Sequence, residues 1–202
     1  MKTVILIGGA PGTGKSTLAK KLSKHLSLPW ISTDQLRGIV RDYATRDRYP
    51  DLLLPEDCDT AELFLTKYTA KEIAEMEYQQ AYDVWPAVEY LVTENYAWKE
   101  GVLIEGVNIV PELLEKIAKD TVDLHALFLI DEDHDRLKDV VYGRGIWDKA
   151  DTYSDDLKPK EIEWVSIFTK MLKESSQRHG FTALEVQKDD NDIEMALHVL
   201  KL

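Results

Sequence analysis

A glycine-rich segment near the N-terminus carries the residues of this chain that are best suited to bind phosphate. From Gly9 to Ser16 the sequence fits the pattern G-x-x-x-x-G-K-S. Its glycines let backbone N–H groups approach a phosphate chain, because few Cβ atoms stand in the way. An apolar run at 3–7 precedes the pattern, and leucines at helical spacing follow it. A strand, a loop and a helix in this order form the context in which the pattern binds nucleotide phosphates.

Two side chains at the end of the pattern have chemistry of their own. The ammonium of Lys15 is expected to reach the β- and γ-phosphates of ATP, and the hydroxyl of Ser16 is expected to bind Mg²⁺. The helix that begins at Lys15 adds unpaired N–H groups and the positive end of its dipole. The pattern does not separate ATP from GTP, and its structural alternative is a glycine-rich turn. The expected nucleotide-contacting residues are Gly9, Ala10, Pro11, Gly12, Thr13, Gly14, Lys15, Ser16 and Thr17.

An aspartate and an arginine three residues apart follow the second expected strand, 30–32. Asp34 and Arg37 would be neighbours on the first turn of a helix, at the carboxyl end of a strand, where open α/β sheets bind ligands. The Asp34 carboxylate can orient or deprotonate an acceptor hydroxyl, and Arg37 can grip an anionic group of that acceptor. The structural alternative is an N-capping aspartate with a local ion pair, with either Thr33 or Asp34 as the cap.

The apolar segment 102–107 contains an acid near its carboxyl end. Such an acid is typical of the Walker B position, which steadies Mg²⁺ through its water shell. Here the acid is Glu105 rather than the more common aspartate. Glu105 and Ser16 are therefore the expected metal ligands, and Asn108, at the end of the strand, is expected to hydrogen-bond the acceptor. The structural alternative for Glu105 is a strand-end acid without a ligand.

Arg144 stands between two glycines and is followed by the polar stretch 146–160. We expect a lid at about 144–160 with this arginine at its hinge. Arg144 would neutralise charge on the transferring phosphoryl group, and closure of the lid would exclude water. The structural alternative is a cation at the end of a helix beside a C-capping glycine. The four aspartates of the stretch are unusual for a phosphate clamp.

The composition is that of a globular protein. The chain has 202 residues, 44% hydrophobic and 31% charged, which favours a single domain with a sizeable core. A net charge of −12 and a pI of about 4.9 count against a large nucleic-acid surface. The single cysteine, Cys58, rules out an internal disulfide and suits a reducing compartment. With no apolar run long enough to span a membrane, the expected location is the cytoplasm.

The patterning along the chain predicts an α/β domain. Apolar strands are expected at 3–7, 30–32, 102–107, 122–130 and 181–186, alternating with amphipathic helices. Between the second and third strands, 60–99 is expected to form one long helix and then another from Pro86, because proline suits the first turn of a helix. An acceptor-binding insertion is expected there, at about 45–100. The other expected helices are 15–27, 33–43, 111–119, one ending near 142, 159–178, and a last one to Leu200 capped by Asp189, Asp190 or Asn191.

These motifs resemble those of the small P-loop kinase superfamily, and within it the 2-phosphoglycerate kinase-like group. The resemblance rests on G-G-A-P-G-T-G-K-S at 8–16, S-T-D-x-x-R at 32–37 and I-E-G-V-N-I-V-P at 104–111. It implies a P-loop NTPase fold: a five-stranded parallel sheet of order 2-3-1-4-5 with helices on both faces. By the same resemblance, Asp34 and Arg37 face the acceptor. Asn108 stands where that group has histidine, and polynucleotide and zeta-toxin-like kinases share the D-x-x-R placement.

The sequence thus predicts one kinase domain over 1–202. Its expected reaction moves the γ-phosphoryl group of Mg-ATP to a hydroxyl of a small, anionic, 2-phosphoglycerate-like metabolite. Lys15 and Arg144 would stabilise the transition state, and Asp34 would act as base or orienter. One alternative is a polynucleotide or nucleotide-sugar kinase, although the net charge counts against a polynucleotide. Another is a nucleotide-dependent switch without an acceptor, which would need neither Asp34 nor Arg37. The identity of the acceptor and the number of subunits stay open.

Overall fold

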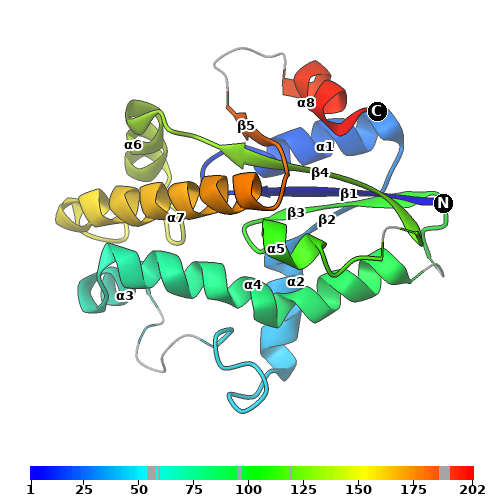
Figure 1. Cartoon of the computed structure of the whole chain (residues 1–202). Coiled ribbons are helices and arrows are strands. Elements are labelled where there is room, and N and C mark those ends of the chain that lie inside the picture. The colour runs from blue at the N-terminus through cyan, green and yellow to red at the C-terminus, as the bar shows by residue number, and fades with distance from the viewer. Residues whose placement is uncertain (54–57, 59, 95–96, 119, 187–191) are drawn as a thin grey trace.

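The computed structural model describes residues 1–53, 58, 60–94, 97–118, 120–186 and 192–202. A five-stranded sheet forms its centre, and Figure 1 shows it nearly edge-on with a layer of helices on each side. Each strand pair is parallel, and the order is β2-β3-β1-β4-β5. The predicted fold class and sheet order are therefore confirmed. The strands are β1 (Lys2–Gly9), β2 (Trp30–Ser32), β3 (Gly101–Gly106), β4 (Val122–Ile130) and β5 (Ala183–Glu185).

The helices of the described residues follow the strands in alternation. Parallel strands need such crossovers, because the chain must return to the same end of the sheet. The helices are α1 (Lys15–Leu26), α2 (Thr33–Tyr43), α3 (Ala61–Lys67), α4 (Ala70–Thr93), α5 (Pro111–Leu114), α6 (His134–Gly143), the 3₁₀ turn η1 (Asp155–Leu157), α7 (Lys158–Arg178) and α8 (Asp192–Leu200).

The central strand β1 is apolar on both faces. Val4 and Leu6 belong to a large core shared with α4, α5 and α7, and Ile5 and Ile7 belong to a smaller core shared with α1 and α8. Successive side chains of a strand point to opposite faces, so a continuous apolar run fills both cores. In Figure 1, α1 and α8 accordingly lie above the sheet, and α4 and α5 lie below it.

The helical region between β2 and β3 differs from the sequence prediction. The expected start of a helix at Pro86 is wrong, because α4 continues through this proline. The break falls earlier, between α3 and α4. There the Thr69 side chain accepts a hydrogen bond from the Glu72 amide, and the Glu72 carboxylate accepts one from the Thr69 amide. This capping box favours a helix start at Ala70. The cost of one lost N–H at Pro86 is outweighed by the buried packing of α4 around it.

A buried lysine joins the start of the sheet to the end of this insertion. Lys2 Nζ donates hydrogen bonds to the carbonyls of Leu91, Val92 and Glu94, at 2.7, 3.2 and 2.6 Å. A cation stabilises the carbonyls that a helix C-terminus leaves unpaired. The N-terminal strand thereby fixes where α4 ends.

The C-terminal half follows the prediction with shorter elements. β4 has the expected bounds, but the fifth strand is limited to β5. The predicted helix 111–119 is also too long, because Lys116 and Ile117 bond three residues back and tighten the chain beyond α5. The predicted caps of the last helix, at 189–191, lie outside the described residues. Within the described parts of the chain, no helix is long and apolar enough to cross a membrane.

Candidate active site

The glycine-rich loop joins the carboxyl end of β1 to the start of α1. Gly14 precedes the helix with φ 80°, a left-handed conformation that glycine adopts without strain. No side chain of the described residues caps α1, and its first turn has no acid. The first hydrogen bonds of α1 come from the Thr17 and Leu18 amides to the Gly14 carbonyl. The preceding amides are left for a ligand, which makes this helix start suited to bind an anion.

Lys15 is the buried cation of this loop. Its side chain is folded back so that Nζ donates to the Ala10 carbonyl at 2.8 Å, and the residue is 8% exposed. The pKa of Lys15 is lowered to about 8, chiefly by burial; the carboxylates of Glu105 and Asp34 oppose this shift, and the Arg144 guanidinium adds to it. Thr13 Oγ1 donates to the same carbonyl at 2.9 Å. Lys15 is therefore a poorly solvated charge, which a phosphate would stabilise.

Ser16 and Glu105 meet at the carboxyl ends of β1 and β3. Ser16 Oγ donates to Glu105 Oε1 at 3.1 Å, and Glu105 is paired in the sheet with Ile7 of β1 and Ser32 of β2. Burial raises the pKa of Glu105, whereas Lys15 and the hydroxyls of Ser32 and Ser16 lower it. A hydroxyl beside a carboxylate is the kind of oxygen pair that Mg²⁺ takes along with waters and phosphates.

The pair fits a partly hydrated Mg²⁺ better than a metal held by protein alone. Among the described residues, no group of three acidic, histidine or cysteine side chains could hold a metal. Mg²⁺ usually binds through one or two carboxylates and the phosphates of its substrate. Ser16 and Glu105 would supply such a partial set.

Asp34 and Arg37 lie on the first turns of α2, as predicted. The cap is Ser32, not Thr33 or Asp34: Ser32 Oγ accepts from the Asp34 amide at 3.3 Å. The Asp34 carboxylate is thereby free of capping, and its side chain is 61% exposed. Arg37 Nη2 lies 3.5 Å from an Asp34 oxygen. The two groups are thus held side by side at the switch between strand and helix.

Two buried residues of α4 complete this arrangement. Arg37 Nη1 donates to Glu77 Oε2 at 3.4 Å and to Gln80 Oε1 at 3.2 Å. Burial raises the pKa of Glu77, and the guanidinium of Arg37 lowers it. The sequence prediction missed Glu77 and Gln80. The sequence pattern could have identified them, because both polar residues fall at helical spacing from Ile73 and Ala81, on the buried side of α4.

A cavity of about 470 Å³ brings most of the predicted residues together. The predicted residues that line it are Pro11, Gly12, Gly14, Lys15, Ser16, Thr17, Asp34, Arg37, Glu105 and Arg144. Its charged side chains balance, since three are cationic and three, including Glu77, are anionic. A nucleotide triphosphate alone would bring excess negative charge, so this lining suits a triphosphate together with a divalent cation.

Four predicted residues do not line this cavity, and one of them, Thr13, lines a separate cavity of about 210 Å³. Gly9 and Ala10 support the loop from within the core and do not line the cavity. Asn108 is fully buried, and both polar atoms of its side chain are without a hydrogen-bond partner among the described residues. It does not line the cavity, so direct contact with an acceptor would require it to move.

The segment predicted as a lid packs against two helices. Trp147 stacks on Trp164 of α7, with ring centroids 4.8 Å apart and planes 8° apart, and meets Phe64 of α3 edge-on at 5.0 Å. Asp148 accepts a hydrogen bond from the Ala61 amide at 2.7 Å. These contacts hold Arg144, the residue after α6, at the edge of the cavity.

Two smaller cavities adjoin the first. One, of about 160 Å³, lies between α2, α3, α4 and the segment after α6. It shares Arg37, Glu77 and Trp147 with the 470 Å³ cavity, which we call the phosphate cavity. The other, of about 210 Å³, lies beyond the glycine-rich loop, between Arg136 and the end of β5. Arg136 is fixed there by Asp131 at 2.5 and 2.6 Å. The phosphate cavity therefore shares lining residues with both smaller cavities.

Residues 5–115 match a family model described as an AAA domain. This match covers more than half of the 202 residues and includes the loop, α2 and β3. The chain belongs to the AAA domain family. The sequence resemblance to 2-phosphoglycerate kinases is confirmed by similarity to curated relatives of that name.

Two relatives match nearly the whole chain. The 2-phosphoglycerate kinase of Methanocaldococcus jannaschii is 25% identical over 202 residues, which cover 98% of this chain and 62% of the relative. That of Methanopyrus kandleri is 24% identical, and the match covers 95% of this chain and 58% of the relative. The AAA domain chain thus spans about six-tenths of the length of these relatives.

Solved kinases share the fold at low sequence identity. A gluconokinase from Sinorhizobium meliloti is 14% identical with a TM-score of 0.55, covering 98% of this chain and 91% of that one. A shikimate kinase from Bacteroides thetaiotaomicron is 14% identical with a TM-score of 0.52, covering 99% of each chain. These likenesses establish the P-loop kinase fold.

Proposed function

We propose that this AAA domain protein is an ATP-dependent phosphotransferase that moves the γ-phosphoryl group to a hydroxyl of a small anionic hydroxy acid. The observation that carries the proposal is the cavity where Lys15, Asp34 and Arg144 meet. A nucleotide-binding loop alone would need only the first of these. An exposed carboxylate and a second cation at the same place are what phosphoryl transfer requires in addition.

The nucleotide would bind along the loop and α1. The amides before Thr17 and the ammonium of Lys15 would hold the phosphates, and the cavity near Arg136 would receive the base. Ser16 and Glu105 would hold Mg²⁺, which neutralises charge on the β- and γ-phosphates when bound. Arg144 would approach the transferring group from the other side of the cavity and stabilise the charge that develops on it.

Asp34 would act on the acceptor. The acceptor oxygen forms a bond to the γ-phosphorus while the bond from this phosphorus to the bridging oxygen breaks, and ADP leaves with the bonding electrons. The hydroxyl proton passes to the Asp34 carboxylate and from there to solvent, to which Asp34 is open. Arg37, beside Asp34, would hold the acid group of the acceptor. The names of the relatives make the glycerate skeleton the first to test.

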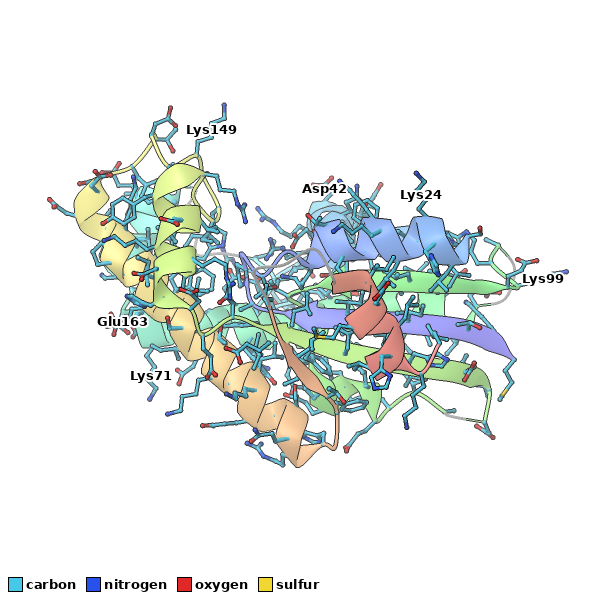
Figure 2. The ribbon with its side chains drawn as sticks, turned by 90° about the horizontal axis from the view of Figure 1, so that it is seen from above. Lys24, Asp42, Lys71, Lys99, Lys149 and Glu163 are labelled. Carbon is cyan, nitrogen blue, oxygen red and sulfur yellow. The ribbon has the colours of Figure 1, made fainter. Side chains whose placement is uncertain are left out.

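The test is a screen for Mg-ATP-dependent transfer of labelled γ-phosphate to a panel of hydroxy acids, polyols, nucleosides and oligonucleotides. Lys15→Met and Asp34→Asn are run beside the wild type. Lys24→Met and Asp42→Asn are matched controls, since both residues are exposed on the same helices, α1 and α2, and project from the outer surface in Figure 2. We expect transfer by the wild type and both controls, and at least a hundredfold loss in both site variants.

Other outcomes would contradict the proposal. Normal ATP binding with no transfer to any acceptor would favour a nucleotide-dependent switch. Transfer to oligonucleotides instead of small acids would favour a polynucleotide kinase. Asp34→Asn with full activity would remove Asp34 from the reaction.

A further inference from the structure

We propose that the 160 Å³ cavity is the acceptor's site, and that Glu77 makes it select an unphosphorylated hydroxy acid over its phosphate ester. This inference rests on the proposed function and narrows its substrate class. The observation behind it is a buried carboxylate on the wall that this cavity shares with the phosphate cavity.

The location follows from the shared wall. Arg37, Glu77 and Trp147 line both cavities, so a molecule in the smaller one lies next to the phosphates in the larger one. Asp34 lines the larger cavity and is ion-paired at 3.5 Å with Arg37, which lines both. A hydroxyl at the shared wall would meet both the γ-phosphoryl group and the base. Phosphoryl transfer needs this in-line proximity of its two substrates.

The selectivity follows from the charge already present around Arg37. Its Nη1 donates to Glu77 and Gln80, and its Nη2 is beside Asp34. The Glu77 side chain is 6% exposed, so water cannot screen its charge. The positive charge of Arg37 is therefore already matched by Glu77, so Arg37 can hold the single charge of a carboxylate at a lower cost than the double charge of a phosphate.

The remaining charges of the cavity lead to the same result. The described residues that line it carry two cations, Arg37 and Arg41, and two anions, Glu77 and Asp148. A monocarboxylate adds one negative charge to this neutral set, whereas a phosphate ester of the same acid adds almost two more. A phosphate dianion also has no proton to donate to Glu77 or to the Gln80 carbonyl, but a hydroxyl has one. The site should thus bind the unphosphorylated acid more tightly than its phosphate ester.

Matched pairs of acceptors test this inference directly. The pairs are glycerate with 2-phosphoglycerate, and gluconate with 6-phosphogluconate, so each pair differs only by a phosphate. Affinity is measured by calorimetry with a non-hydrolysable ATP analogue and Mg²⁺ present, and kcat/KM is measured by phosphoryl transfer. We expect at least one unphosphorylated acid to exceed its ester at least tenfold in both measurements.

The variant Glu77→Gln removes the charge and retains the shape. We expect it to reduce the preference for the unphosphorylated acid at least tenfold, chiefly by tightening binding of the ester. Glu75→Gln is the matched control, because Glu75 is exposed on the same helix and pairs with Lys71. It should leave the preference unchanged.

Each outcome decides between the inferences. Tighter binding of the esters, binding of none of the four acids, or an unchanged preference in Glu77→Gln would overturn the acceptor-site inference while leaving phosphoryl transfer possible. The expected binding preference without any transfer would support the site and overturn the proposed reaction. If Glu77→Gln does not fold, the comparison of each acid with its ester on the wild-type protein is sufficient to test the inference.

Discussion

Replacing Lys15 by methionine should stabilise the free protein while abolishing nucleotide binding. The pKa of Lys15 falls from 10.5 to about 8 in the folded state, because its ammonium is buried. Each unit corresponds to about 1.4 kcal/mol, so keeping the charge at pH 7 costs about 3 kcal/mol. Methionine has a similar length and no charge, and the Ala10 carbonyl keeps its hydrogen bond from Thr13. We expect Lys15→Met to gain about 2 kcal/mol, or about 4–8 °C in Tm.

The pH dependence gives this prediction its sign. Between about pH 8 and 10.5 the folded protein releases the Lys15 proton and the unfolded chain retains it, so wild-type stability rises with pH in this window. The variant has no such group. Its advantage should therefore be greatest at pH 7 and fall by about 2 kcal/mol, to near zero, by pH 9.5.

Urea unfolding followed by fluorescence of the five tryptophans measures both quantities. Lys24→Met on the same helix is the control and should change stability by less than about 0.5 kcal/mol. Mg-ATP at about a hundred times its Kd should add about 2.7 kcal/mol to the wild type and nothing to Lys15→Met. A Lys15→Met protein that is less stable than the wild type at pH 7, or whose advantage does not change with pH, would refute the reasoning.

Two further predictions concern β3. Burial raises the pKa of Glu105, so this carboxylate takes up a proton at a higher pH than an exposed glutamate. Mg²⁺ affinity in the presence of nucleotide should therefore fall as the pH is lowered from 7.5 to 5.5, and Glu105→Gln should bind Mg²⁺ weakly at every pH; a wild-type titration that is flat with pH contradicts this. At Gly106, an added Cβ would lie 1.7 Å from Thr33 Oγ1, so Gly106→Ala should destabilise the protein by about 3 kcal/mol in urea unfolding. Adding Thr33→Ala should recover part of this loss, and a fully stable Gly106→Ala would show that the strand can shift without cost.

The local chemistry of the nucleotide loop could be predicted because it depends on neighbouring residues. The glycines, Lys15 and Ser16 owe their arrangement to one turn between a strand and a helix, whose sequence pattern is specific. The strands could be predicted equally well, since a run that is apolar on both faces must be buried in an α/β sheet. The helix boundaries at Pro86 were harder, because packing outweighed the local preference of proline.

The sequence by itself determined three features of this protein. The resemblance predicted the sheet order, and the local patterns predicted the phosphate loop and the pairing of Asp34 with Arg37 on one helical turn. Only the tertiary structure decided which distant groups share the site. Ser16 meets Glu105 across 89 positions, and Arg37 meets Gln80 across 43. These contacts depend on how β3 and α4 pack against β1 and α2. Such packing minimises the free energy of the whole core, so no local pattern encodes that Glu77 neutralises Arg37.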